Sequence, residues 1–413
     1  DVCSSDLKYV GGLLMKKVLA IFMVLAMLAG CVALTACGKK DNNDPTNSSD
    51  QPSKTDTVNV DDIPDTMNST DGKYVIAMVT DVGQLKDKSF NQGTWNGVKL
   101  YASQNSKSYK YYQPANDSNA NDEDRYNAFV AAITGGAEII VTPGFLQEAA
   151  LKRVAAEYPD VKFVFIDGYP LQDAAGNDLK NIAAVAFKEE QCGYLAGYAA
   201  VVEGNTKLGF TGGGAGTNPA VNRYGYGFVQ GIQDAAKAAN VKCEVNYSYL
   251  YGTNYSASAE LQTMVSGWYS AGTECVFACG GSMCNSVFAA AAAENAFSIG
   301  VDVDQAEEST TVITSAMKGL AAATQKILGA YFDGKWDTVG GVSSNLGVDD
   351  DAVGLPFETS RFNKFTKDEY QKIFDSMKTG GGLTVKDDYT DFLANKVEFE
   401  NVTVNFIDRK SVV

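Results

Sequence analysis

The chain has 413 residues, with 34 basic and 50 acidic side chains and a net charge of −16 at neutral pH. Such an acidic surface repels the phosphates of nucleic acids, so we exclude DNA and RNA as partners. The sequence contains no histidine. This absence removes Ser-His-Asp and Cys-His nucleophilic sites, the commonest general base and His-containing zinc sites, and it argues against most hydrolases.

The first predicted element is a short apolar run near the N-terminus. Two lysines after Met15 precede the eleven apolar residues Val18–Leu28, a length that suits a signal-peptide core and falls short of the roughly 20 residues that span a bilayer. Small residues then lead into Leu34-Thr35-Ala36-Cys37. This pattern resembles a bacterial lipoprotein signal, in which the cysteine becomes the lipidated N-terminus. The alternative is an ordinary secretory signal cut near Ala29 or Ala36.

We therefore expect residues 15–36 to be a signal peptide and residues 1–14, which carry no targeting pattern, to be foreign to the protein. Residues 37–72 are expected to be the lipid anchor, on Cys37, and a disordered tether. The stretch Gly38–Gly72 is rich in Asn, Asp, Ser and Thr, and this composition cannot bury enough apolar surface to fold.

From Lys73 onward, short apolar runs alternate with helical segments. The predicted strands are Tyr74–Thr80, Glu138–Thr142, Lys162–Asp167, Ile182–Phe187, Lys207–Thr211, Val241–Tyr249, Cys275–Ala278, Phe297–Val301 and Thr311–Ser315. The predicted helices are Asn91–Ser103, Leu146–Glu157, Glu189–Val202, Ala220–Ala239, Ser256–Ala271, Asn285–Asn295 and Lys318–Phe332. Buried runs joined by helices indicate parallel sheets covered on both faces, here in a two-lobed α/β protein. Ligands of such sheets sit beyond the carboxyl ends of the strands.

The C-terminal part of the chain does not continue this alternation of strands and helices. Thr384–Val404 looks rich in strands and is expected to close one sheet, whereas Arg409–Val413 shows no structural pattern and is expected to be foreign to the domain.

Five cysteines follow Cys37, and their spacing matches no paired metal site. Most lie among apolar or small residues, so we expect them to be buried as small hydrophobic side chains. The five are Cys192, Cys243, Cys275, Cys279 and Cys284. A disulfide between the last two, near a predicted ligand loop, is left open.

Six motifs, two of them made of two segments, recur in one order along the chain and together carry a family resemblance. They are Val79–Gly83 with Asp87–Gln92, Phe187–Glu190 with Leu195–Gly197, Gly225–Gly231, Cys279–Gly281, Gly300–Gln305 and Thr314–Lys318. In this order they resemble the basic membrane protein (BMP) family, the purine nucleoside receptor A-like lipoproteins that bind the substrates of ABC importers. The resemblance covers about residues 73 to 345.

The resemblance implies a type I periplasmic-binding-protein-like fold. The first lobe would comprise 73–187 with about 313–346, and the second 188–312 with about 347–408. It further implies a non-enzymatic, monomeric protein without cofactor or metal, anchored to the cell membrane and facing outward. Such a protein would capture a nucleoside, with purine nucleosides such as inosine, guanosine or adenosine expected first, and deliver it to ABC permease subunits.

The predicted ligand site lies at the strand ends. Phe90 can stack on a base, and Asp81 and Asp302 can accept hydrogen bonds from sugar hydroxyls. Without the resemblance, Phe90 would be a helix staple and each aspartate a helix N-cap. Lys318 is expected to open a helix, where the dipole disfavours a cation, so it needs a ligand or carboxylate partner; its alternative is a solvated lysine.

The remaining candidate ligand residues rest mainly on the family motif. Asn91 could bond the base edge, Phe187 could stack or line the hinge, and Gly280 with Gly281 would let the backbone approach a ligand. Asp167 ends the predicted strand Lys162–Asp167 and resembles a family position that faces the cleft.

Two loops depart from the family pattern. Thr211–Gly216 is unusually rich in glycine, and because it lacks the lysine and hydroxyl of a phosphate-binding loop we do not expect it to bind phosphate. In Gly280–Asn285, Met283 and Cys284 could narrow the cleft.

Three alternative functions stay open at this stage. The same cleft could bind a free sugar or another small carbonyl compound, or the protein could be a surface sensor without transport. Asp302 and Asp304, two apart on one strand, could also act as the paired carboxylates of a glycosidase.

Overall fold

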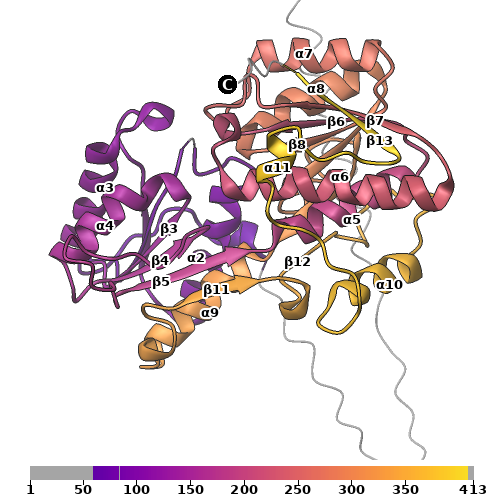
Figure 1. Ribbon diagram of the computed structural model, residues 1–413. Helices are drawn as coiled ribbons and strands as arrows, with labels where there is room; N and C mark the ends of the chain where they lie inside the picture. The colour runs from indigo at the N-terminus through magenta and orange to yellow at the C-terminus, as the bar shows by residue number, and fades with distance from the viewer. Residues whose placement is uncertain (1–58, 83, 408–413) are drawn as a thin grey trace, which may run out of the picture. The chain divides into compact units, whose positions relative to one another are not determined.

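The computed structural model describes residues 59–82 and 84–407, which form two parallel-sheet lobes (Figure 1). The first sheet has the strand order β11-β5-β4-β3-β1-β2, and the second has the order β12-β10-β9-β8-β6-β7-β13. Adjacent strands are parallel except β10 and β12, which pair antiparallel. The predicted two-lobed α/β fold is confirmed.

The first lobe contains six strands and the helices that cover them. Its strands are β1 (Ile76–Val79), β2 (Tyr109–Tyr112), β3 (Ile139–Pro143), β4 (Lys162–Ile166), β5 (Ile182–Phe187) and β11 (Ser343–Leu346). Its helices are α2 (Phe90–Gln104), α3 (Asp122–Thr134), α4 (Glu148–Glu157) and α9 (Leu320–Phe332), with short 3₁₀ turns at η1 (Val60–Asp62), η2 (Asp117–Asn119), η3 (Phe145–Gln147) and η6 (Trp336–Thr338).

The second lobe is built in the same way. Its strands are β6 (Lys207–Gly212), β7 (Cys243–Ser248), β8 (Cys275–Cys279), β9 (Phe297–Asp302), β10 (Val312–Lys318), β12 (Val353–Gly354) and β13 (Val402–Phe406). Its helices are α5 (Glu189–Val202), α6 (Pro219–Ala239), α7 (Ala259–Ser270), α8 (Cys284–Glu294), α10 (Lys367–Met377) and α11 (Thr390–Leu393), with 3₁₀ turns at η4 (Gly214–Gly216), η5 (Gly281–Met283) and η7 (Val348–Asp350).

Burial on both faces explains why the apolar runs became strands. In β1, Ile76 and Met78 pack into one core and Ala77 and Val79 into another, since successive side chains point to opposite faces. Helices α3 and α4 contribute to the second of these cores, around Phe129. The two helical layers therefore fix the sheet, and with it the positions of the loops at the strand ends.

Three chain crossings connect the lobes: β5 to α5, β10 to α9, and β11 to η7. Backbone bonds tie them together, with Lys188 N–H donating to Leu346 O at 2.9 Å and Gly319 N–H to Ala352 O at 2.7 Å. Because β10 pairs with β9 and β12, the second crossing lies after Lys318. The expected lobe boundary at 313 is wrong by one strand.

Other expectations also need correction. Lys318 ends β10 and does not open a helix, because its backbone pairs with Val353. Thr384–Val404 contains α11 and only the start of β13, although β13 does extend the second sheet beside β7. The strands β2, β11 and β12 and the helices α3 and α10 were not predicted. The strands are only two to four residues long, whereas each helix begins with a capping box, Asn121 with Asp124 and Thr366 with Glu369, a signal that sequence reasoning missed.

Part of the expected disordered tether is ordered. Ile63 is buried, and the ammonium of Lys99 on α2 donates to Ile63 O at 3.1 Å and to Asp65 Oδ1 at 2.9 Å. Trp95 Nε1 also donates to Asp65. The segment around Ile63 and Asp65 is thus bound to the first lobe by contacts that composition does not reveal. The signal peptide, Cys37 and Arg409–Val413 lie outside the described residues.

The five later cysteines are buried and carry free thiols, as expected for small core side chains. Cys279 and Cys284 are therefore not joined in a disulfide. Within residues 59–82 and 84–407, no helix is long and apolar enough to cross a membrane.

Candidate functional site

A cavity lies where the carboxyl ends of strands from both sheets converge. Asp81 follows β1 and Asp167 follows β4 in the first lobe, while Asp302 ends β9 and Lys318 ends β10 in the second. All four line the cavity, whose empty volume, counted out to its open mouth, is about 610 Å³.

Eight of the nine predicted ligand residues line this cavity. They are Asp81, Phe90, Asn91, Asp167, Gly280, Gly281, Asp302 and Lys318. Phe187 does not, because its side chain is the last of β5 and is buried in the core at 1% exposure. The centre of its ring lies 5.6 Å from Lys318 Nζ, so it packs beneath the site.

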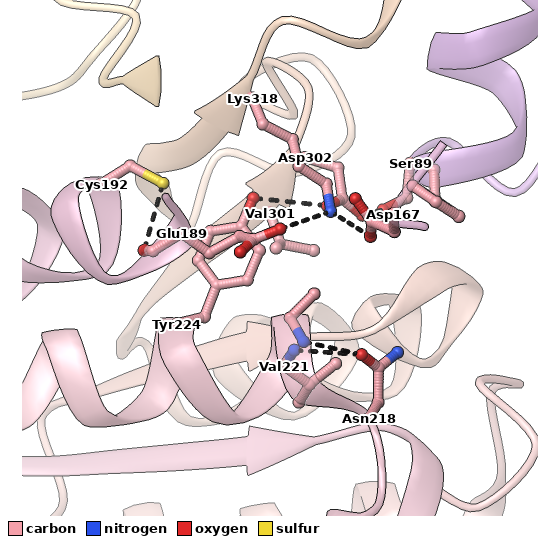
Figure 2. A network of polar contacts seen from close by, with 12 residues as sticks. Ser89, Asp167, Glu189, Cys192, Asn218, Val221, Tyr224, Val301, Asp302 and Lys318 are labelled. Carbon is pink, nitrogen blue, oxygen red and sulfur yellow. Dashed lines mark hydrogen bonds and ion pairs between the residues drawn. The ribbon is translucent and has the colours of Figure 1, made fainter. Parts of the chain in front are cut away.

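The ammonium of Lys318 is the charged centre of the site (Figure 2). Its Nζ lies 2.5 Å from Asp167 Oδ2, 3.3 Å from Glu189 Oε1 and 3.7 Å from Asp302 Oδ1. Burial alone would lower the pKa of Lys318, but the three carboxylates outweigh this effect and raise it above its usual value. Lys318 is therefore a cation at any physiological pH.

The carboxyl groups around Lys318 titrate differently. Burial raises the pKa of Asp167 to about 6, against the opposing attraction of Lys318. Burial also raises the pKa of Asp302. For Glu189, burial opposes ionisation, but Arg223 and Lys318 together hold its pKa below the usual value. Glu189 is thus the carboxylate that stays ionised most firmly.

Two of these aspartates have a strained backbone. Asp167 has φ 57° and Asp302 has φ 68°, in the left-handed region that few residues other than glycine adopt. Such strain persists only where the surroundings hold it in place, and it gathers at functional sites. Both carboxyl groups face Lys318, from opposite lobes.

Asp302 also joins the two lobes. Ser89, which precedes α2 in the first lobe, donates its hydroxyl to Asp302 Oδ2 at 2.5 Å, and Tyr224 of α6 donates to Oδ1 at 3.4 Å. Gln305 Nε2 adds a second bond between the lobes, to Lys88 O at 2.8 Å. These contacts hold the lobes together around the cavity.

Asp81 is positioned by its neighbours but keeps a free oxygen. Its backbone N–H donates to Asn91 Oδ1 at 3.0 Å, and its Oδ1 atom is buried without a hydrogen-bond partner. Burial raises the pKa of Asp81 to about 7. Asp167 Oδ1 is likewise buried and unpartnered. Such buried atoms carry a large desolvation cost, and both keep the capacity to accept a hydrogen bond.

Asn91 shapes the site and has little hydrogen-bonding capacity left for a ligand. Besides accepting from Asp81, its Nδ2 donates to Val82 O at 3.2 Å and to Asp87 Oδ2 at 3.2 Å. Asp87 in turn caps α2 by accepting from the N–H groups of Ser89 and Asn91, both at 2.9 Å.

Sequence reasoning missed Tyr255, which explains the glycine-rich loop Thr211–Gly216. Tyr255 follows β7, lines the cavity and accepts from Asn218 Nδ2 at 2.9 Å. A Cβ on Gly213 or Gly214 would lie within 2.3 Å of its ring or hydroxyl. The glycines therefore make room for the ring of Tyr255. The run of glycines is a signal for such a contact, but the sequence does not say which side chain fills the space.

Other expected features are absent from the cavity. Met283 and Cys284 are buried in the core and do not narrow it. Asp304 is exposed and accepts from the Thr359 hydroxyl at 2.6 Å, so it does not face the cavity with Asp302. The paired carboxylates of the glycosidase hypothesis are not formed.

A family model and several curated proteins match the chain. The model described as "ABC transporter substrate-binding protein PnrA-like" matches residues 74–388. The "ABC transporter nucleoside-binding protein BmpA" of Lactococcus lactis subsp. cremoris is 29% identical over 69% of this chain and 82% of its own length. The "CD4+ T-cell-stimulating antigen" of Listeria monocytogenes is 28% identical over 73% and 86%, and "Basic membrane protein B" of Borreliella burgdorferi is 28% identical over 75% and 86%.

Solved structures share the fold at low sequence identity. A solute-binding protein of an ABC transporter system from Aeropyrum pernix superposes with a TM-score of 0.59 at 21% identity, covering 79% of this chain and 93% of that one. One from Conexibacter woesei gives 0.57 at 20% identity, covering 76% and 98%. At these identities the likeness supports the two-lobed binding-protein fold alone.

Proposed function

The chain belongs to the family of PnrA-like substrate-binding proteins of ABC transporters, and we propose that the solute it captures is a nucleoside, with a purine nucleoside as the first candidate. As a member of this family it binds and delivers a substrate and is not an enzyme. Its partners are the small molecule and the permease subunits of a transporter.

The observation that carries the proposal is the mixture of groups in one cavity. Each lobe contributes an aromatic side chain, Phe90 from α2 and Tyr255 from the loop after β7. Flat rings favour stacking on a base, at about 0.5–1.5 kcal/mol beyond area burial. A relative named as nucleoside-binding adds support.

The polar groups suit a ribose. Asp302 and Asp167 can accept from hydroxyl groups, and Lys318 can donate to a hydroxyl or ring oxygen. Asp81, whose Oδ1 is free, can engage a polar edge of the base. Asp87 and Asp167, whose pKa values of about 6 leave them mostly ionised at neutral pH, make the cavity wall acidic. A 5′-phosphate would therefore be repelled, and a nucleoside is preferred over a nucleotide.

Closure of the lobes would bury this ligand. The three crossings form the hinge, and hinge closure around a ligand is the usual motion of two-lobed binding proteins. We propose further that Cys37 carries a lipid and holds a monomer at the outer face of the cell membrane, on the strength of the lipoprotein-like signal before it.

Calorimetry with inosine and ribose tests the ligand class. Inosine is expected to bind far more tightly, because only inosine can use the aromatic walls. Asp302→Asn should weaken inosine binding about 10- to 100-fold, since a hydrogen bond to a charged group contributes about 1.5–3 kcal/mol. Asp304→Asn, two residues away and exposed, is the matched control.

A second experiment separates the alternatives. Mass spectrometry of ligand released from the purified protein should identify a nucleoside. If it shows a free sugar, or if ribose binds as tightly as inosine, a sugar-binding protein of the same fold replaces the proposal. If a pull-down with the full chain recovers no permease subunit, the protein is better explained as a surface sensor.

A further inference from the structure

The carboxylate of Glu189 connects the cavity to a contact between the lobes. Glu189 opens α5 directly after the first crossing, and its side chain is 0% exposed. Its Oε1 accepts from Lys318 Nζ at 3.3 Å, and its Oε2 accepts from Arg223 Nε at 2.7 Å. Arg223 Nη1 donates to Tyr169 OH at 3.2 Å. An unbroken chain of polar contacts thus runs from the cavity to Tyr169.

This chain of contacts crosses from one lobe to the other. Arg223 belongs to α6 of the second lobe, and Tyr169 follows β4 in the first. Tyr169 is 48% exposed, whereas the Arg223 side chain is 13% exposed. A hinge motion that separates the lobes must break the bond between them, while the bonds of Glu189 to Lys318 and Arg223 stay within the second lobe and the hinge.

None of Glu189, Arg223 and Tyr169 lines the cavity. Their effect on a ligand must therefore act through Lys318 or through lobe closure. Glu189 is suited to this because both of its oxygens are committed to cations. A buried carboxylate with two cations keeps its charge and fixes the direction of each donor.

We propose that Glu189 is a positioning residue that holds Lys318 toward the ligand and Arg223 toward Tyr169, and that the Arg223–Tyr169 bond is a latch that slows ligand release. The latch links occupancy of the cavity to the closed arrangement, because the same carboxylate orients both cations. The choice of inosine for measuring release rests on the proposed function. The latch itself does not depend on which ligand binds.

Stopped-flow kinetics with inosine on the full chain test the latch. Tyr169→Phe removes only the hydroxyl and should raise the dissociation rate about 3- to 10-fold, as expected for one hydrogen bond, with little change in association. Arg223→Lys keeps a cation beside Glu189 but loses the planar donor fork, so it should show the same faster release. Tyr251→Phe, at an equally exposed tyrosine (49%) outside the cavity, is the control and should match the wild type.

Combining substitutions separates positioning from general structural support. Glu189→Gln should speed release, and adding Tyr169→Phe to it should have no further effect, because the latch is already lost. Additive effects would mean that Glu189 does not orient Arg223 and would overturn the proposal. So would a Tyr169→Phe protein that releases inosine at the wild-type rate.

A ligand-free measurement keeps the latch testable if nucleosides do not bind. Small-angle X-ray scattering should give a larger radius of gyration for Tyr169→Phe than for wild type and Tyr251→Phe, as the lobes open more often. Failure of inosine to bind the wild type would refute the proposed function alone. Equal radii of the three ligand-free proteins would refute the latch.

Discussion

Replacing Lys318 with Met tests the electrostatic arrangement of the site most directly. The substitution keeps an unbranched side chain of similar length but removes the ammonium that faces Asp167, Glu189 and Asp302. Removing one partner of a buried ion pair leaves an uncompensated charge and costs about 3–5 kcal/mol. With three carboxylates affected, we expect the upper end of this range.

The loss should depend on pH in a defined direction. The pKa of Asp167 is already raised by burial to about 6, and loss of the Lys318 attraction raises it further. A carboxyl group whose pKa is higher in the folded than in the unfolded state stabilises the fold when protonated. The variant should therefore be most stable near pH 4 and lose stability, more steeply than wild type, as the pH rises through 6.

Urea unfolding between pH 4 and pH 8 measures this effect. Lys326→Met, at an exposed lysine of α9, is the control and should change the free energy of unfolding by less than about 0.5 kcal/mol. If Lys318→Met were as stable as this control at pH 8, the three carboxylates would not depend on Lys318 and the reasoning would be wrong.

Two further outcomes follow from the same site. The ligand-free wild type should lose stability from pH 5 to pH 8. Burial raises the pKa of Asp81 to about 7 and those of Asp87 and Asp167 to about 6, so the folded state holds protons that the unfolded state releases. A free energy of unfolding, measured with urea, that stays flat or rises over this range would contradict the prediction. Gly144→Ala should weaken inosine binding at least about 10-fold in calorimetry, as its Cβ would lie 2.1 Å from Asp81 Oδ2 at φ 95° and displace a group that contributes about 1.5–3 kcal/mol. Gly176→Ala is the control, because Gly176 has a similar φ of 85° but open space around it, so the substitution adds only backbone strain. If the two variants bound inosine equally well, Asp81 would not contact the ligand.

The sequence predicted the strands and helices that depend on local patterns. The apolar run Ile182–Phe187 and the helix Glu189–Val202 were predicted with the bounds that the structure has. Both are long, buried and strongly periodic or continuous, so local sequence and tertiary packing agree. Short elements such as β12, with two residues, exist only because a neighbouring strand offers hydrogen bonds, and no local pattern marks them.

The order of strand ends also placed most of the site. Asp81 and Asp302 come directly after predicted strands and Asp167 ends one, and parallel strands bring their carboxyl ends to one edge. The order of the strands along the chain did not predict which charged side chains form ion pairs. Lys318 was expected in a helix with an unknown partner, and its three partners, Glu189, Asp167 and Asp302, lie 129, 151 and 16 positions away in sequence.

The sequence by itself therefore determined the class of fold, the acidity of the cleft and the side chains available at the strand ends, since these follow from composition and from the period of apolar residues. Only the tertiary structure decided that Glu189 is the buried counterion, that Phe187 lies beneath the site and that Tyr255 rests on a glycine loop. The first two outcomes depend on how the chain packs around the hinge, between residues more than a hundred positions apart, and the third depends on a contact within the second lobe. None of these contacts leaves a trace in local spacing.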